Sequence, residues 1–507
     1  MKYLIGIDLG TSGTKTVLFD EFGKAIASST VEYPLYQPEN GWAEQDPADW
    51  WDACVKTLQS VMAESKISAK DVAGIGFSGQ MHGLVMLDEN GEVLRKSIIW
   101  CDGRTAAECA DITNRVGAAR LIELTANPAL TGFTAGKILW VRNNEPEVYK
   151  RCRHILLPKD YLRYKLTGKY GAEVSDAAGM NMLDVPNRCW SDEVLKKLEI
   201  DHSLLPDVHE SSELAGHITA EVAALTGLSE GTPVVYGGGD NAAAAIGTGV
   251  VEKGKAFITI GTSGVIFAHA DSVAVDPGGR VHTFCSAVPG AWTVMSCTLA
   301  AGMSLQWLRN NFFAPEMNTA KGLEQDPYEI MTAQAKRVPI GANRLIYLPY
   351  LMGERSPILD PNSRGVFFGL SAIHTKYDML RAVLEGVVYS QRQNLDVLLG
   401  MGVEFSEIYA TGGGGTSSVW RQMIADVFNL PVTTIQNREG PALGAAILAG
   451  VGTGLYSSVS EACKSIIKTN PSQDPIKENS TKYEDYYKLY CDLYPAMKDS
   501  FGKLAGL

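Results

Sequence analysis

Two short stretches of small and hydroxyl residues could bind a phosphate chain. Each reads Gly-Thr-Ser-Gly, first at positions 10–13 and again at 261–264. Glycine lets a ligand approach the backbone N–H groups closely, and the Thr and Ser hydroxyls add further donors. An apolar run that is broken by a single acid, Asp8, comes directly before the first stretch. These residue types therefore predict two phosphate-binding turns, one of them beside a carboxylate.

A second candidate for chemistry is Asp240, which follows three consecutive glycines at the end of the apolar run 232–236. An Ala-rich helix is predicted directly after Asp240 and Asn241. Asp240 is then either the cap of that helix or a catalytic carboxylate at the mouth of a cleft. Capping requires no glycine triplet, whereas access for a substrate does. We therefore favour the catalytic role.

The loop Gly79–Gly83 contains Gln-Met-His between two glycines, and it follows the predicted buried strand 72–78. Loops at strand ends commonly present side chains into a cleft, although a lone histidine in a turn is ordinarily without function. The stretch 98–104 has the same design: an apolar run, a polar loop that ends at Arg104, and then a predicted helix. Both loops are therefore candidates for substrate contacts.

The elements that must position these residues can also be predicted. Apolar and β-branched runs flank both Gly-Thr-Ser-Gly turns, at 3–9 and 14–19 and at 256–260 and 265–268, which indicates two β-hairpins. Two similar hairpins predict two similarly built domains that share one nucleotide. The alternative is that the two turns are unrelated and have the same four residues by chance. A helix is expected at 297–307. A strand, a glycine-rich loop and a helix over 408–428 are typical of a nucleotide-binding α/β domain.

The composition limits the classes of function. The 507 residues predict two domains, with a boundary near 247–254, and the net charge of −12 without a basic block argues against a nucleic-acid or membrane partner. Nine cysteines without a C-x-x-C pair, and a first strand that begins at once, predict a cytoplasmic protein with free thiols. The sequence contains no P-loop and no H-E-x-x-H motif, and no G-x-G-x-x-G motif follows a predicted strand.

Taken together, three motifs resemble the FGGY family of carbohydrate kinases, in the actin-like ATPase superfamily: the loops 79–83 and 237–241, and Leu348-Pro-Tyr-Leu-Met-Gly-Glu-Arg355. The resemblance implies an α/β fold with two ribonuclease-H-like domains around a central cleft. Residues 1–248 would bind the sugar and carry the base. Residues 249–507 would bind ATP and end in a helical tail.

The resemblance also implies roles for individual residues. Asp240 would be the general base, and Asp8 a catalytic carboxylate that holds Mg²⁺ at the phosphate end. The expected sugar contacts are Met81, His82, Arg104, Asp240 and Asn241. The expected nucleotide contacts are Thr11, Ser12, Gly13, Lys15, Thr262, Gly302, Gln306, Gly413, Gly414 and Ser417. Some relatives carry Asn at the position of Ser417.

The expected activity is ATP-dependent phosphorylation of a ketopentose, with D-xylulose as the favoured sugar and D-xylulose 5-phosphate as the product. Ribulose, gluconate and glycerol are the alternatives within the family. A non-catalytic sugar sensor is a further alternative, but it would need neither Asp8 nor Asp240. A filament-forming or chaperone ATPase would leave the loop 79–83 unexplained. The sequence does not give the oligomeric state, and a homodimer is left open.

Overall fold

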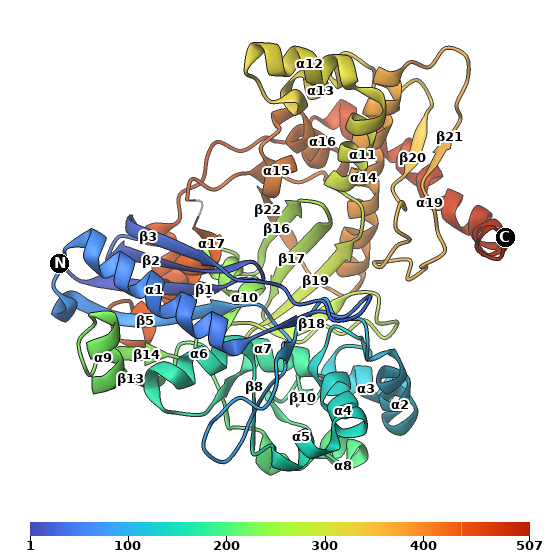
Figure 1. Cartoon of the computed structure of the whole chain (residues 1–507). Coiled ribbons are helices and arrows are strands. Elements are labelled where there is room, and N and C mark those ends of the chain that lie inside the picture. The colour runs from blue at the N-terminus through green and yellow to red at the C-terminus, as the bar shows by residue number, and fades with distance from the viewer. Residues whose placement is uncertain (438) are drawn as a thin grey trace.

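The computed structural model describes residues 1–437 and 439–507, and it contains two large mixed β-sheets (Figure 1). The first sheet has the strand order β13-β14-β5-β1-β2-β3, with β15 beside β5, and the second has the order β18-β19-β17-β16-β22-β23. The first sheet comprises β1 (Tyr3–Leu9), β2 (Gly13–Asp20), β3 (Ala25–Glu32), β5 (Val72–Gly79), β13 (Leu214–His217), β14 (Pro233–Val235) and β15 (Gly238–Gly239). The second comprises β16 (Gly254–Ile260), β17 (Gly264–Ala270), β18 (His282–Cys285), β19 (Trp292–Thr298), β22 (Phe405–Thr411) and β23 (Val432–Thr433).

The two sheets share one core pattern. β1 pairs antiparallel with β2 and parallel with β5, and β16 pairs antiparallel with β17 and parallel with β22. Each Gly-Thr-Ser-Gly stretch therefore forms the turn of a hairpin at the centre of its own sheet. Both predicted hairpins are confirmed, and they occupy equivalent places in two similarly built units.

Helix α1 (Pro47–Ser65) begins where local signals predict. Asp46 caps α1, its carboxylate accepting from the Ala48 N–H at 3.0 Å, and Pro47 is the first helical residue. The helices that matter for the site are α1 (Pro47–Ser65), α2 (Ala106–Val116), α4 (Thr134–Asn144), α6 (Pro158–Thr167), α7 (Val174–Ala177) and α10 (Asp240–Gly247).

The helix predicted at 297–307 is wrong at its start. Cys297 belongs to β19, which is hydrogen-bonded to β17 on one side and β18 on the other, and the helix begins only at Gly302. Pairing with β17, where Cys297 lies opposite Val265, overrides the weak local preference of these residues. The helices of the second half include α11 (Gly302–Phe312), α14 (Lys376–Gly400), α15 (Gly412–Gly415), α16 (Ser418–Phe428), α17 (Gly440–Gly452) and α19 (Lys477–Ala505).

Helix α17 returns from the second half of the chain to the first sheet, where it packs on β1 and β5 and beside α10. Glycines permit this close approach. A side chain at Gly6 would overlap the Ala442 carbonyl, and one at Gly444 would overlap the Ala243 carbonyl. The ranges 1–248 and 249–507 remain a prediction, although a helix from the second range covers a sheet of the first.

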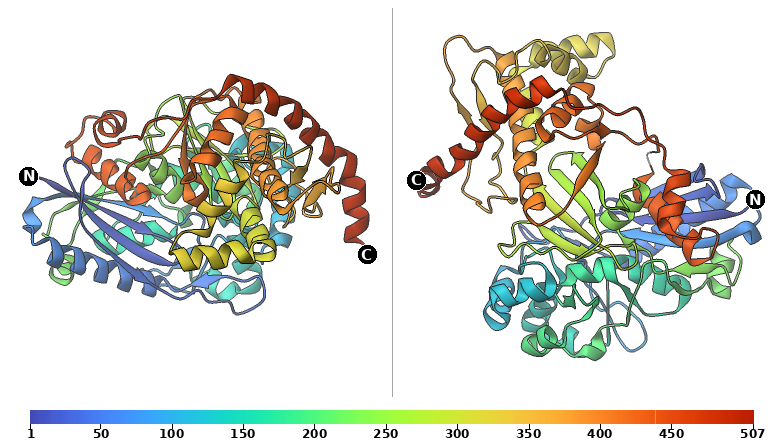
Figure 2. Two further views of the ribbon diagram at one scale, coloured as in Figure 1. Left: turned by 90° about the horizontal axis from the view of Figure 1, so that it is seen from above. Right: turned by 180° about the vertical axis from the view of Figure 1, so that it is seen from behind.

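Further views show the N- and C-termini at opposite edges of the molecule, with the C-terminal helix α19 on the outside of the second half (Figure 2). Over the residues described, no helix is both long enough and apolar enough to cross a membrane.

Candidate active site

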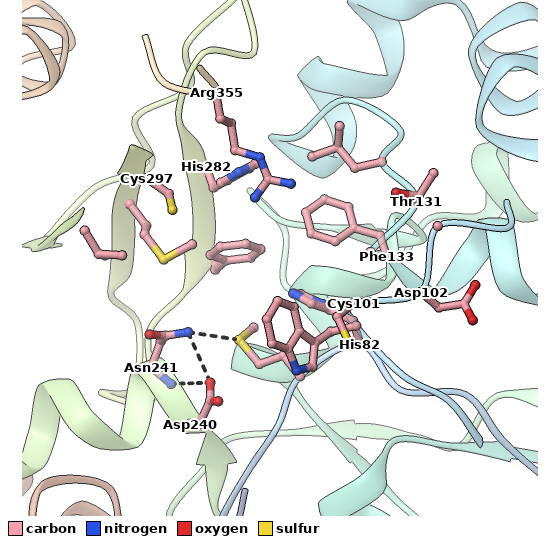
Figure 3. A pocket seen from close by; sticks show the side chains of 18 residues that line it. His82, Cys101, Asp102, Thr131, Phe133, Asp240, Asn241, His282, Cys297 and Arg355 are labelled. Carbon is pink, nitrogen blue, oxygen red and sulfur yellow. Dashed lines mark hydrogen bonds between the residues drawn. The ribbon is translucent and has the colours of Figure 1, made fainter. Parts of the chain in front are cut away.

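A cavity of about 530 Å³ lies between the two halves of the chain (Figure 3). Its wall comes from loops of the first half and from strands and one loop of the second. The side chains that matter below are Met81, His82, Asp240 and Asn241 from the first half, and Val265, His282, Cys297 and Arg355 from the second. A ligand in this cavity would therefore contact both halves of the chain.

Four of the predicted sugar contacts meet in this cavity, because their loops leave the first sheet at the same edge. Gly239 of β15 pairs in parallel with Gly79 of β5, so the chain continues side by side into Met81 and Asn241. The Asn241 amide nitrogen lies 4.0 Å from the Met81 sulfur. A side chain at Gly239 would come within 2.9 Å of Met81, which explains why a glycine precedes Asp240.

Asp240 is the first residue of α10, and Gly239 occupies the cap position. The Asp240 carboxylate accepts from the backbone N–H of Asn241 at 2.7 Å and from the Asn241 side-chain amide at 3.1 Å. A capping side chain accepts from the backbone N–H two or three residues further along the helix, and neither of these bonds does so. The structure therefore does not support the role of Asp240 as a helix cap. Burial, reinforced by the nearby charge of Asp8, raises the pKa of Asp240 to about 7. A carboxylate with this pKa suits a general base at neutral pH.

The imidazole ring of His82 is neutral and is held in place by a hydrogen bond through its Nδ1. Its Nδ1 lies 3.0 Å from the Gly179 carbonyl oxygen, which can only accept, so Nδ1 carries the proton and Nε2 is the acceptor. The His82 carbonyl in turn accepts from Lys137 Nζ at 2.7 Å. Burial and the charge of Lys137 lower the pKa of His82 well below its ordinary value.

A network of buried charges contacts both the loop 79–83 and the loop 237–241, and within it Asp176 accepts from the His82 N–H at 3.4 Å. Lys159 Nζ lies 3.3 Å from a Glu173 oxygen and 3.4 Å from an Asp176 oxygen, and all three side chains are fully buried. The Ser175 hydroxyl, which donates to Glu173 at 2.7 Å, accepts from the Gly239 N–H at 3.0 Å. Sequence reasoning missed this network, whose only sequence signal is the spacing of Glu173 and Asp176 three residues apart.

Asp8 lies near the first Gly-Thr-Ser-Gly turn, and its carboxylate accepts from the Ser78 hydroxyl at 2.8 Å. Burial raises the pKa of Asp8 above its ordinary value. Its strand neighbour Lys15 forms an ion pair with Glu439. The turn itself is linked to the cavity, since the Trp100 indole N–H, on the cavity wall, donates to the Thr11 hydroxyl at 2.9 Å.

The second Gly-Thr-Ser-Gly turn meets the start of α11. The N–H groups of Ala301 and Met303 each donate to the Thr262 carbonyl at 3.1 Å, and the Gly302 N–H donates to the Gly261 carbonyl at 2.8 Å. A side chain at Gly302 would overlap that carbonyl, so the close approach requires glycine. Thr262 and Gly302, predicted from distant motifs, therefore lie side by side.

The remaining predicted nucleotide residues lie around this turn or beyond it. Gly414 belongs to the helical turn α15, and a side chain there would come within 2.5 Å of Ile260, at the start of the turn. Gly413 and Gln306 are exposed. Ser417 is the cap of α16, and its hydroxyl accepts from the Trp420 N–H at 3.4 Å. Ser12 and Gly13 complete the first turn.

Arg104 does not line the cavity, in contrast to its predicted sugar contact. Its guanidinium lies 3.7 Å from the centre of the Trp42 ring and forms ion pairs with Glu44 at 2.8 Å and Asp102 at 2.7 Å. Arg104 supports the cavity wall indirectly, because its partner Asp102 is a lining residue. Sequence reasoning assigned no individual role to the lining residues Trp100, Asp102, His282, Cys297 and Arg355, although the first two lie in the loop 98–104 and Arg355 ends a motif of the resemblance.

Comparison with known proteins shows which family this chain belongs to. The model of the FGGY family of carbohydrate kinases, N-terminal domain, matches residues 3–247, and that of its C-terminal domain matches residues 256–453. A Bacillus subtilis protein named xylulose kinase is 40% identical over 98% of this chain and 98% of its own. A gluconokinase from Bacillus licheniformis is 33% identical over 99% of this chain and 98% of its own.

The crystal structure of xylulose kinase from Rhodospirillum rubrum superimposes with a TM-score of 0.92 at 30% identity, over 99% of this chain and 100% of that one. This match confirms the predicted α/β class, with two actin-like domains around a cleft. The two family models together cover most of the chain, one for each domain type. The chain therefore belongs to the FGGY family of carbohydrate kinases.

Proposed function

We propose that this chain transfers the γ-phosphoryl group of ATP to D-xylulose and releases D-xylulose 5-phosphate and ADP. The observation that carries the proposal is the position of Asp240, a carboxylate with a pKa of about 7 in the cavity that also contains His82, Met81 and Asn241. The relatives named xylulose kinase, which this chain resembles over nearly its whole length, support the choice of sugar.

In the proposed reaction, Asp240 takes the proton of the sugar hydroxyl as the hydroxyl oxygen forms its bond to the γ-phosphorus. The bond from that phosphorus to the bridging oxygen breaks, and ADP leaves with the electron pair. The Asn241 N–H and side-chain amide both bind the same Asp240 oxygen. The other carboxylate oxygen is then the one that would face the hydroxyl.

The phosphate chain of ATP would lie between the two Gly-Thr-Ser-Gly turns. We assign to it the first turn, through Thr11, Ser12 and Gly13, and the second, through Thr262 and Gly302. The other proposed nucleotide contacts are Lys15, Gln306, Gly413, Gly414 and Ser417. Since Lys15 is paired with Glu439, a phosphate oxygen would have to replace that carboxylate as its partner.

Asp8 suits Mg²⁺ in this scheme. Magnesium in kinase sites usually takes one or two protein carboxylates and completes its shell with phosphates and water. Among the described residues no group of three or more His, Cys, Asp or Glu could form an all-protein metal site. Asp8 is a single carboxylate whose pKa is raised by burial, so a bound cation would favour its ionised form. When bound, the ion would neutralise charge on the β- and γ-phosphates.

Gluconate is the second candidate substrate. It is favoured by the gluconokinase relative and by the cation Arg355 on the cavity wall, which could pair with a carboxylate. The two neutral histidines of the cavity, His82 and His282, weigh against it, because neither supplies a positive charge.

The test is ADP release from the purified enzyme with D-xylulose, D-ribulose, gluconate or glycerol. We expect the highest kcat/KM with D-xylulose. A higher value with gluconate or glycerol would contradict the proposed sugar but not the family. Sugar binding without any ADP release would instead support the non-catalytic sensor.

A further inference from the structure

Arg355 is a cation at the end of the cavity opposite Asp240 (Figure 3). It follows β20 (Ile346–Leu348) in the second half of the chain. Its backbone is held firmly: the Arg355 N–H donates to Glu354 at 2.8 Å, and the same Glu354 oxygen accepts from the Leu299 N–H at 2.9 Å. Within residues 1–437 and 439–507, no acidic side chain forms an ion pair with its guanidinium. The guanidinium is therefore a positioned donor that faces the cavity.

His282 places an acceptor beside this donor. Its Nδ1 lies 2.8 Å from the Asn127 side-chain oxygen, and the Asn127 amide nitrogen donates to the Thr283 carbonyl at 2.8 Å, which fixes the orientation of the amide. Nδ1 of His282 therefore carries the proton and Nε2 is the acceptor, as in His82. The charge of Arg355 helps to lower the pKa of both histidines, so both rings stay neutral.

One donor beside two acceptors suits a specific chemical group. The end of an open-chain ketose, a ketone with a hydroxyl on the carbon to either side, offers one oxygen that only accepts and two hydroxyls that can each donate. A carboxylate offers two accepting oxygens and no proton, so it would leave the histidine nitrogens facing lone pairs. A polyol has no carbonyl oxygen for the guanidinium.

We propose that Arg355 donates to the ketone oxygen of the sugar, while His82 and His282 each accept from one of the two hydroxyls next to the ketone. This inference rests on the proposed function, since Asp240 binds the hydroxyl that is phosphorylated, at the opposite end of the same cavity. Because Arg355 comes from the second half and His82 from the first, a ketose would join the two halves. Recognition of the ketone and closure of the cleft would then occur together.

The test compares D-xylulose with xylitol, which has a hydroxyl in place of the ketone. Arg355→Met removes the charge and keeps an unbranched side chain. A hydrogen bond to a charged group corresponds to about 10–100-fold in binding, so kcat/KM for D-xylulose should fall by about that factor. The value for xylitol should change less than about threefold, which is near the scatter expected for a lost weak contact. Arg355→Lys should recover part of the ketose preference.

The matched control is Arg364→Met, on the same loop. Arg364 is exposed and donates only to nearby carbonyls, those of Pro361 at 2.9 Å and Ser363 at 2.8 Å. This variant should keep the wild-type preference. Equal losses of kcat/KM for D-xylulose and xylitol in Arg355→Met, or no loss for either, would overturn the inference.

Calorimetric titration of D-xylulose without ATP separates this inference from the proposed function. Arg355→Met should weaken D-xylulose binding about tenfold or more, by the same argument, and leave ATP binding unchanged. If the wild-type enzyme phosphorylates gluconate better than D-xylulose, the proposed function fails. Independently of that result, the role of Arg355 fails if its removal leaves D-xylulose binding unchanged.

Discussion

Asp240 and His82 lie within one cavity, and in both the protein favours the neutral form. Burial raises the pKa of Asp240 and lowers that of His82, because desolvation disfavours whichever form is charged. The consequences differ. Asp240 titrates near neutrality and can take up a proton, whereas His82 keeps its acceptor nitrogen at every pH at which the enzyme is expected to work.

Asp240→Asn keeps the shape of the side chain but removes its capacity to accept a proton. A positioned general base contributes about 10²–10⁴-fold, so kcat should fall within that range while the KM for sugar changes little. Steady-state kinetics together with a thermal melt, to confirm folding, would measure this. More than about a tenth of wild-type kcat in the variant would exclude Asp240 as the base.

The pH dependence of kcat/KM should report the same group. Asp240 must be ionised to accept a proton, and its pKa is raised to about 7. Activity should therefore rise with pH up to about 7 and then level off, with about a tenfold loss for each pH unit below that value. A pH–rate profile of the free enzyme checks this. A profile that stays flat down to pH values near the ordinary aspartate pKa would contradict it.

Asp8→Ala should raise the Mg²⁺ concentration needed for half-maximal activity, because the variant loses the carboxylate proposed to hold the ion. D-xylulose affinity without ATP should stay near the wild-type value. The acid limb of kcat/KM should also move to lower pH, because the charge of Asp8 contributes to the raised pKa of Asp240. Normal turnover with an unchanged Mg²⁺ titration would exclude Asp8 as the metal ligand.

Asp240 is the first residue of α10, and this helix is positioned by its packing against α17. The two helices meet at glycines, so that backbone packs directly on backbone. Side chains at Gly247 and Gly444 would overlap the carbonyls of Gly440 and Ala243, respectively. Close-packed interiors tolerate little extra volume. The placement of Asp240 therefore depends on a residue about two hundred positions later in the chain.

Gly444→Ala should force the two helices apart. Overpacking of this kind costs about 1–3 kcal/mol of unfolding free energy, and kcat should fall because α10 moves with Asp240. Urea unfolding and steady-state kinetics measure the two effects. The control is Gly502→Ala in α19, where an added methyl group meets nothing within 4 Å.

Gly502→Ala should leave activity unchanged and the stability equal or up to about 1 kcal/mol higher, because alanine is the better helix former. Equal stability of Gly444→Ala and the wild type would show that the helices can separate without cost.

At the scale of the whole molecule, both halves of the chain contribute to the cavity wall. Water is itself a competent nucleophile toward ATP, so productive alignment should require the sugar to draw the two halves together. The direct contact proposed between a ketose and both His82 and Arg355 supplies a physical reason for such closure.

The radius of gyration of the enzyme should therefore decrease when D-xylulose binds. Small-angle X-ray scattering with and without the sugar measures this, with glycerol at the same concentration as the control. An unchanged radius, together with rapid ATP hydrolysis in the absence of sugar, would instead indicate a rigid and preformed site.

The sequence by itself determined the features that depend on neighbouring residues. Both hairpins follow from apolar runs around a small-residue turn, and α1 begins at Asp46-Pro47, where a side chain caps its own helix. The three glycines before Asp240 predicted an accessible carboxylate, because a helix cap requires no glycine triplet whereas access for a substrate does. Such preferences act over a few residues and remain readable without the fold.

Only the tertiary structure decided the features that depend on distant partners. Cys297 is in a strand because it pairs with Val265 of β17, and Arg104 is withdrawn from the cavity because Trp42 and Glu44 bind it. Arg355 reaches the site from a loop more than a hundred residues beyond Asp240, and Asp8 affects the pKa of Asp240 across a similarly long separation. These effects act through space, and their energies depend on burial and proximity, which the order of residues does not specify.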